Sequence, residues 1–401
     1  MNIGVFVAKI LPSTGGGYTF QDELVRSLTK LAGTSRHKFT LLINGEIHPD
    51  IYKTLDLNQI RYLYYQRPDL VDRLATRVST LNLPLLSRIV PKRLSKLDRM
   101  ARELGIDLIW FVTPASVEID LPYITVVWDL QHRLQPWFPE VSAKGIWHAR
   151  ERHYLWSLQR ASIIIAGTEV GKKEIERFYQ IPSERIKIIP HPTPGYSLNA
   201  APGDNRDILN KYNIPPGYLF YPAQFWPHKN HANLLISVKI LKDDYKLVLP
   251  VVLVGSDKGN MDYIKSLVGE LNLSKQIYFL GFVPQVDLIS LYRNAFALTY
   301  ITFFGPENLP PLEAFALGCP VVASNVDGAE EQLGDAALLV NPKKPEQIAS
   351  TIKYLYDNPD LQKVLIQRGL ERASKWTNED FVKKVFILLD ELEPIRRCWE
   401  K

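Results

Sequence analysis

The chain has 401 residues, of which 46% are hydrophobic, with 28 prolines and 22 glycines. This length exceeds one typical domain, and the composition excludes the disordered and fibrous classes of protein. The net charge of +5 is mild, no apolar run reaches membrane-spanning length, and the two cysteines, Cys319 and Cys398, have the spacing of neither a zinc site nor a redox pair.

Short runs rich in valine and isoleucine alternate with longer helical patterns in the first half of the chain. This alternation predicts strands buried on both faces of a parallel sheet. The predicted strands cover residues 3–8, 39–43, 60–64, 106–111, 124–128, 163–166 and 186–189. A helix is predicted over 19–31, where apolar residues recur at helical spacing. The first run has no basic leader or cleavage site, so we expect a cytoplasmic protein.

Between Arg73 and Arg102 the chain carries eight basic residues and one acid, Asp98, interleaved with leucine, isoleucine and valine. Such a stretch can lie peripherally on an anionic membrane at the inner face. The alternative is a solvated helix face whose leucines pack on the sheet. Nucleic acid is not expected as a partner, because no recognised binding motif accompanies the charge.

A segment rich in proline and glycine, residues 191–203, interrupts the alternation and predicts a domain boundary. Strands are then predicted at 218–221, 251–254, 276–280, 297–300, 321–323 and 337–340. The fold class is therefore α/β, with two doubly wound Rossmann-like domains over 1–195 and 203–375 that face each other across a cleft. A last helical pattern near 379–392 suggests that residues 376–401 pack back on the first domain.

Ligands of open α/β sheets bind beyond the carboxyl ends of the strands, so the loops after strands are the candidates for function. The first such loop contains Gly15, Gly16 and Gly17, which let the backbone approach a ligand before a helix begins. It is not a dinucleotide fingerprint, because the last position of the G-x-G-x-x-G register is Phe20. A nicotinamide enzyme is therefore not expected.

Two further loops carry polar side chains after predicted strands. Asp129 and His132 follow the strand at 124–128 and are expected to face the cleft, where either could orient an acceptor hydroxyl. A lone histidine in a loop can equally be structural. Lys229, five residues after Gln224, precedes a helix and could neutralise a diphosphate; otherwise it is a surface lysine near a helix start.

The segment Phe304–Val322 predicts a helix start that binds an anion. Tandem prolines fit the first helical positions, and Gly318 ends the helix. Free N–H groups around Asn308 and Leu309, with the positive end of the helix dipole, suit a diphosphate. Glu313 lies in the first turn, where its carboxylate suits the paired hydroxyls of a ribose. An ordinary capped helix is the alternative.

These loops, in this order, resemble the retaining GT-B glycosyltransferases of family 4, and the resemblance spans nearly the whole chain. It is carried by residues 309–322, by Pro227-His228-Lys229-Asn230 and by the glycine loop that contains Gly16 and Gly17. That family transfers sugars from nucleotide donors to acceptors.

The resemblance implies a role for each matching residue of the donor site. Glu313 would hold the ribose hydroxyls, Lys229 the diphosphate, and the backbone around Asn308 and Leu309 the phosphate and sugar. The loop that contains Phe282 would flank the base.

Three positions depart from the family pattern. A glutamate is usual eight residues before Glu313, where this chain has Gly305, and Glu307 is our substitute for the contact with the donor sugar. An arginine is usual at Gln224. The usual His-Asp pair appears as Trp128-Asp129, so His132 is our substitute.

The resulting hypothesis is an enzyme that transfers a sugar from a nucleoside diphosphate to a hydroxyl of a glycan or lipid-linked acceptor, with retention and in surface polysaccharide or glycolipid synthesis. No cofactor is expected, and no metal, because Lys229 and the helix start can stabilise the departing phosphate. Two alternatives remain: a non-catalytic partner subunit of the same fold, and a nucleotide-sugar epimerase or a phosphorylase of related architecture.

Overall fold

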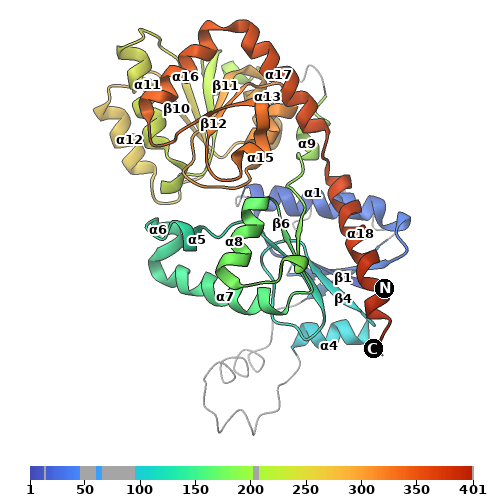
Figure 1. Ribbon diagram of the computed structural model, residues 1–401. Helices are drawn as coiled ribbons and strands as arrows, with labels where there is room; N and C mark the ends of the chain where they lie inside the picture. The colour runs from blue at the N-terminus through green and yellow to red at the C-terminus, as the bar shows by residue number, and fades with distance from the viewer. Residues whose placement is uncertain (13–14, 46–59, 66–94, 202–206, 400–401) are drawn as a thin grey trace.

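The computed structural model describes residues 1–12, 15–45, 60–65, 95–201 and 207–399. Two domains, each built on one parallel sheet, lie one above the other in Figure 1. Arg73 to Lys92, most of the basic stretch, falls outside the described residues. Within the described part, no helix is long and apolar enough to cross a membrane.

The first sheet has seven strands in the order β3-β2-β1-β4-β5-β6-β7. The strands are β1 (Asn2–Val7), β2 (Lys38–Asn44), β3 (Arg61–Tyr65), β4 (Leu108–Phe111), β5 (Tyr123–Val127), β6 (Ile163–Ala166) and β7 (Ile186–Ile188). Every residue of β4, β5 and β6 is buried, as expected for strands covered on both faces.

Helices cover this sheet on both faces. They are α1 (Gly16–Leu31), η2 (Ala32–Thr34), α4 (Lys96–Glu103), α5 (Gln131–Leu134), α6 (Pro139–Ser142), η3 (Ala143–Gly145), α7 (Ile146–Arg160), α8 (Glu169–Tyr179) and η4 (Ser183–Arg185). The connection to the second domain contains α9 (Gly195–Leu198) and α10 (Ile208–Tyr212).

The second sheet has six strands in the order β10-β9-β8-β11-β12-β13. The strands are β8 (Tyr218–Pro222), β9 (Val251–Val254), β10 (Ile277–Gly281), β11 (Ala295–Tyr300), β12 (Val321–Ser324) and β13 (Ala337–Val340). Its helices are η5 (Pro227–Lys229), α11 (His231–Asp243), α12 (Met261–Glu270), α13 (Gln285–Asn294), α14 (Leu309–Ala316), α15 (Ala329–Leu333), η6 (Gly334–Ala336), α16 (Pro345–Asp357) and α17 (Pro359–Ser374).

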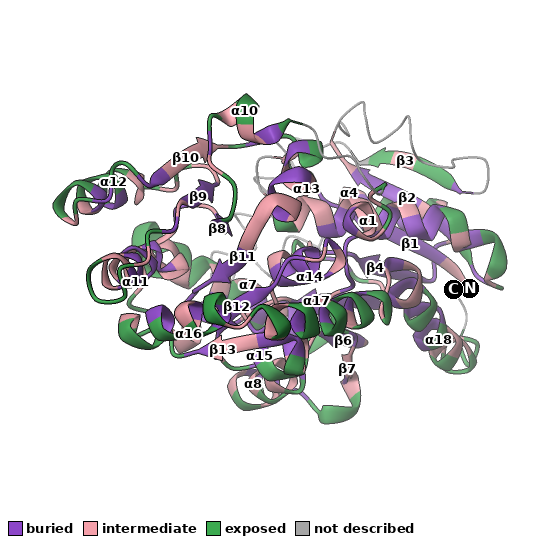
Figure 2. Ribbon diagram, turned by 90° about the horizontal axis from the view of Figure 1, so that it is seen from above, coloured by how far each residue is buried: buried purple, intermediate pink, exposed green. Residues whose placement is uncertain are grey.

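Figure 2 shows the inner strands of each sheet as buried, with exposed helix faces outside. The prediction of two doubly wound sheets is confirmed, and every predicted strand is present within a few residues of its expected bounds. Both sheets reverse their strand order between their first and fourth strands, at β1/β4 and at β8/β11. The loops after β1, β8 and β11 therefore lie at the switch points, where ligands of such sheets bind.

The last helix, α18 (Asn378–Arg396), leaves the second domain and packs beside α1 on the first (Figure 1). Thr377 starts it with a capping box that includes Asp380. Phe381 and Phe386 join the core of the first sheet, and Phe386 stacks on Phe39 with ring centroids 5.1 Å apart.

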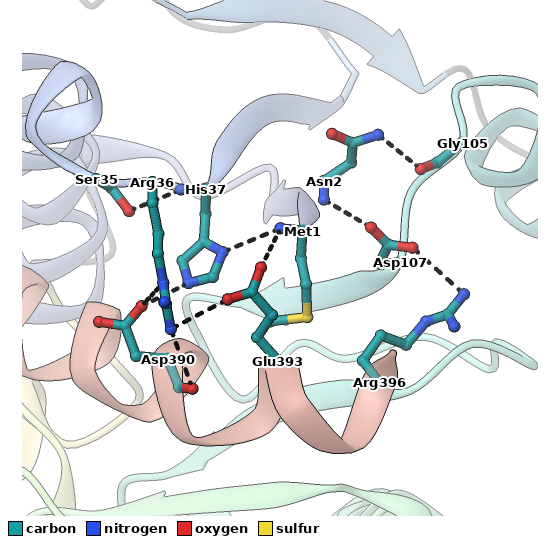
Figure 3. Close-up of polar contacts among 10 residues, drawn as sticks. All are labelled: Met1, Asn2, Ser35, Arg36, His37, Gly105, Asp107, Asp390, Glu393 and Arg396. Carbon is teal, nitrogen blue, oxygen red and sulfur yellow. Dashed lines mark hydrogen bonds and ion pairs between the residues drawn. The ribbon is translucent and has the colours of Figure 1, made fainter. Parts of the chain in front are cut away.

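Charged contacts fix the end of α18 (Figure 3). Arg36 Nε donates to Asp390 Oδ1 at 2.5 Å, and His37 Nε2 lies 3.1 Å from the same oxygen. Arg396 pairs with Asp107 at 3.3 Å. The last described helix is thus bound to the first domain by packing and by charge.

Candidate functional site

The glycine loop of the first domain meets the second domain directly. Gly15 has φ 77°, a conformation that favours glycine, and α1 begins at the next residue. A Cβ built on Gly16 would lie 3.5 Å from Leu309 Cδ1, and one on Gly15 would lie 3.9 Å from Gln224 Nε2. The start of α1 therefore faces two of the predicted donor-site positions.

Gly17 lies behind this contact, against the first domain. A Cβ built on it would be 3.2 Å from the ring of Trp128, the residue that follows β5. Gly17 therefore allows close packing of α1 on Trp128, while Gly16 lies at the domain interface.

The start of α14 is built from Asn308, which caps the helix in an extended conformation at φ −138°. Its N–H donates to Gln332 Oε1 at 2.9 Å, and Gln332 Nε2 donates to its carbonyl at 3.0 Å. The expectation of a free N–H at Asn308 is therefore wrong, because the neighbouring α15 supplies an amide that uses it. Leu309, the first helical residue, is the one that faces Gly16 of the glycine loop.

Lys229 ends η5, which follows β8. Its Nζ donates to the Tyr300 hydroxyl at 2.9 Å and lies 5.2 Å from the centre of that ring. Tyr300 ends β11 and lines a small cavity together with Asn308 and Pro311. The structure thus brings the predicted cation and the predicted helix start to the same place.

Glu313 is buried on α14, and its carboxylate contacts two tyrosines. Tyr292 donates to Oε2 at 2.7 Å, and the Tyr196 hydroxyl also hydrogen-bonds the carboxylate. Burial raises the pKa of Glu313 against the opposing effect of these two bonds. In this structure the carboxylate predicted to hold a ribose is therefore bound by Tyr292 of α13 and by Tyr196 of α9.

The other predicted donor residues of the second domain lie in the loops after β8 and β10. Gln224 Oε1 accepts from Trp226 Nε1 at 2.9 Å, so the glutamine that replaces the usual arginine is oriented by an indole. Phe282 is 63% exposed after β10, and in the described part of the chain no ring contact joins it to the other predicted residues.

His132 does not face the domain interface, so that expectation is wrong. The chain turns into α5 directly after Leu130, and this turn directs the imidazole into the core of the first domain, where it is fully buried. Its Nε2 lies 3.2 Å from Glu151 Oε2 and 3.2 Å from the Tyr179 hydroxyl. Burial, helped by the charge of Arg150, lowers the pKa of His132 to about 4.

Asp129 remains near the interface but is paired. Its Oδ1 accepts from Arg150 Nη2 at 2.6 Å and from the Gln131 N–H at 2.9 Å. Burial works to raise the pKa of Asp129, but Arg150 and the backbone bond outweigh it and lower the pKa overall. Asp129 is thus an ionised carboxylate that orients Arg150 of α7.

Glu307 crosses from the second domain to the first. Its Oε1 accepts the His191 N–H at 2.6 Å, and its Oε2 lies 2.6 Å from His191 Nδ1. Only 3% of the Glu307 side chain is exposed. The space for the carboxylate exists because residue 167 is glycine, since a Cβ there would lie 1.3 Å from Glu307 Oε2.

A second carboxylate, that of Glu140, extends from the first domain to the second. Glu140 of α6 accepts from the backbone N–H of His228 at 3.0 Å and lies 2.5 Å from His228 Nδ1. His228 is the residue before Lys229, so the first domain holds the turn that carries the predicted cation.

Three further hydrogen bonds join the domains. Gln135 Nε2 donates to the Phe303 carbonyl at 2.9 Å. Glu331 of α15 accepts the N–H groups of Glu169 and Val170 at the start of α8, at 2.8 and 3.3 Å.

The sequence does not single out His191 or Glu140 for a role, and His228 stands out only as part of the loop that carries Lys229. His191 follows the strand at 186–189, so the rule that selected the other loops would have included it. It lies in the segment rich in proline and glycine that predicts the domain boundary. Among the described residues, no group of three or more His, Cys, Asp or Glu side chains is arranged to hold a metal ion.

Comparisons with known proteins match both halves of the chain to families. Residues 16–194 match the model described as Glycosyltransferase Family 4, and residues 204–372 match the model described as Glycosyl transferases group 1. The chain is 29% identical over 243 residues to O-antigen chain mannosyltransferase B of Escherichia coli, covering 60% of this chain and 64% of that protein. It is 23% identical over 383 residues to the serotype-specific mannosyltransferase WbdA of Escherichia coli, covering 88% of this chain and 45% of that protein. The matches thus span less than two thirds of these relatives' lengths.

Solved structures share the whole architecture. A glycosyltransferase from Rickettsia africae superposes with a TM-score of 0.71 at 16% identity, covering 98% of both chains. Anabaena HepE, in complex with UDP and glucose, superposes with a TM-score of 0.72 at 18% identity, covering 98% of this chain and 100% of that one. At these identities the likeness establishes the fold.

Proposed function

Since the chain belongs to the family 4 glycosyltransferases of GT-B fold, we propose that it transfers a sugar from a nucleoside-diphosphate donor to a hydroxyl of a glycan or lipid-linked acceptor, with retention of configuration. The observation that supports this proposal is that the loops after β1, β8 and β11 meet at the domain interface. Gly16 faces Leu309, and Lys229 hydrogen-bonds Tyr300, which lines a small cavity with Asn308.

The chemistry follows from where negative charge develops. As the bond to the donor sugar breaks, charge grows on the departing phosphate, and a lysine with a helix N-terminus stabilises it. Lys229 supplies the cation, and the Leu309 end of α14 supplies the dipole. Neither element needs a metal for this role.

We infer that the donor sugar is mannose, because the curated relatives described above are named mannosyltransferases. Their names refer to O-antigen and serotype, which favours a surface polysaccharide as the product of this chain too. On this basis the protein acts at the cytoplasmic face of the membrane, where a lipid-linked acceptor is presented. Residues 73–102 would then supply the peripheral contact with anionic lipid.

A transfer assay tests the proposal. Purified protein is incubated with radiolabelled GDP-mannose, UDP-glucose or ADP-glucose and an octyl mannoside acceptor, without added metal. Product is expected from one donor, and Lys229→Ala is expected to lower kcat by about 10²-fold or more, because it removes a preorganised positive group. Lys363→Ala, an exposed lysine of α17, is the matched control.

The stereochemistry of the product tests the retaining mechanism separately. An α-configured donor should give an α-linked product by NMR. A β-linked product would contradict retention while leaving transfer itself established.

A specific observation favours the alternative of a non-catalytic partner subunit. Glu313 and Glu307, predicted to bind the donor, are both bound by protein groups in this structure. This alternative predicts no sugar transfer and no hydrolysis of any donor in the same assay.

A further inference from the structure

His191 lies where elements of both domains meet. It follows β7, and its ring lies against Phe20 of α1 and Trp128, with centroids 4.8 and 6.3 Å away. Glu307 approaches from the second domain. Trp128 occupies the place of the histidine that the family pattern leads one to expect, so an imidazole is still present beside that position.

The two bonds to Glu307 fix the tautomer of the neutral imidazole. Glu307 Oε1 accepts the His191 backbone N–H, and Oε2 faces Nδ1 at 2.6 Å. Because an ionised carboxylate only accepts hydrogen bonds, the proton of the neutral ring lies on Nδ1. In this neutral tautomer Nε2 carries a lone pair and can accept a hydrogen bond.

Nε2 is also available to a ligand. The His191 side chain is 13% exposed. Some buried nitrogens of the described residues have no hydrogen-bond partner, and His191 Nε2 does not belong to that group. No hydrogen bond within the described residues involves this atom. It is therefore an oriented acceptor that reaches solvent at the domain interface.

We propose that His191 Nε2 accepts a hydrogen bond from a hydroxyl of the sugar substrate, and that Glu307 orients it from the opposite domain. This inference rests on the proposed function, since it places a sugar between the domains. It gives Glu307 an indirect role in place of the direct sugar contact expected from sequence. The arrangement is complete only when the domains meet, so substrate recognition is coupled to closure.

Two substitutions distinguish a His191 that contacts the substrate from a His191 that only bridges the two domains. His191→Asn keeps a side-chain N–H near the position of Nδ1, so the bond to Glu307 is retained while Nε2 is lost. His191→Gln places an amide near the position of Nε2 but loses the Nδ1 contact. His148→Asn, on the exposed start of α7, is the control.

The measurement is kcat/KM for transfer by the three variants and the wild type, with thermal unfolding to verify that each is folded. We expect His191→Asn to lose about tenfold or more, in line with one lost hydrogen bond in a desolvated site, and His191→Gln to retain more activity than His191→Asn. The control should match the wild type.

The reverse order, with His191→Asn near wild type and His191→Gln impaired, would show that His191 only bridges the domains and would overturn the inference while leaving the proposed function intact. If the wild type transfers no sugar from any donor in the panel, the proposed function fails, and this inference fails with it.

Discussion

Gly167 shows how one missing side chain shapes the interface. The position does not require a positive φ, so alanine is compatible with the backbone there. A Cβ would nevertheless overlap the end of the Glu307 side chain, which is flexible and can move away. The residue is therefore needed for the placement of Glu307, and the fold does not depend on it.

Gly167→Ala should displace the Glu307 carboxylate from His191 while the protein stays folded. Hydrogen bonds to charged groups contribute about 1.5–3 kcal/mol, so we expect transfer activity to fall by about 10- to 100-fold. Gly269→Ala, on α12 with open space around the position, is the matched control. Wild-type kinetics for Gly167→Ala would contradict this account of Glu307.

His132 should make stability depend on pH. Its pKa is lowered from 6.5 to about 4 in the fold, so the unfolded chain binds a proton over that range and the folded protein does not. The contribution of His132 to the free energy of unfolding is therefore fully present above pH 6.5 and is lost as the pH falls toward 4. The loss between pH 8 and pH 5 is about 2 kcal/mol.

Urea unfolding at pH 8 and pH 5 measures this loss. The side chain in His132→Gln can still bond Glu151 or Tyr179. In this variant the free energy of unfolding should differ between pH 8 and pH 5 by about 2 kcal/mol less than in the wild type. An unchanged difference would mean that His132 is not the group responsible.

Among the elements, α18 is distinctive because it follows the second domain in the chain and yet adds buried apolar residues to the core of the first domain. Phe381 of α18 packs edge-on to Phe20 of α1, with centroids 5.7 Å apart, and is almost fully buried. Ile387 of the same helix is 48% exposed.

Phe381→Ala should therefore lower the free energy of unfolding by about 3–5 kcal/mol, the usual cost of removing a buried phenyl ring. Ile387→Ala should change it by less than about 1 kcal/mol. Denaturant unfolding followed by tryptophan fluorescence compares the two variants. Equal losses would contradict the packing described for α18.

The elements themselves were predictable from sequence because their signals are local. Valine and isoleucine runs located the strands, and Pro310, Pro311 and Gly318 located α14. The contacts of the site were not predictable in the same way. These contacts are hydrogen bonds between residues that are 21 to 116 positions apart. They join Gln332 to Asn308, Tyr292 to Glu313 and Glu307 to His191. His132 was misplaced because a four-residue helix, which leaves no periodic signal, decides its direction.

At the scale of the molecule, carboxylates hold the two domains together. Glu307 bonds His191, Glu140 bonds His228, and Glu331 bonds the start of α8. Each takes hydrogen bonds from backbone N–H groups of the opposite domain. These three contacts are polar, as is usual where domains move relative to each other.

Removing two of these contacts should open the molecule. We expect the double variant Glu140→Ala/Glu331→Ala to have a larger radius of gyration by small-angle X-ray scattering, with the core of each domain unaffected. Glu330→Ala, an exposed neighbour on α15, should leave the radius unchanged. An unchanged radius in the double variant would mean that these bonds do not set closure.

The central claim is that the domain interface binds a nucleoside-diphosphate sugar through Lys229 and the start of α14. Calorimetric titration of the wild type and Lys229→Ala with UDP, GDP and ADP, without added metal, tests it most directly. The account predicts that one of the three nucleotides binds the wild type and that Lys229→Ala weakens this binding by about tenfold or more. Binding of none of the three, or equal binding by both proteins, would contradict it.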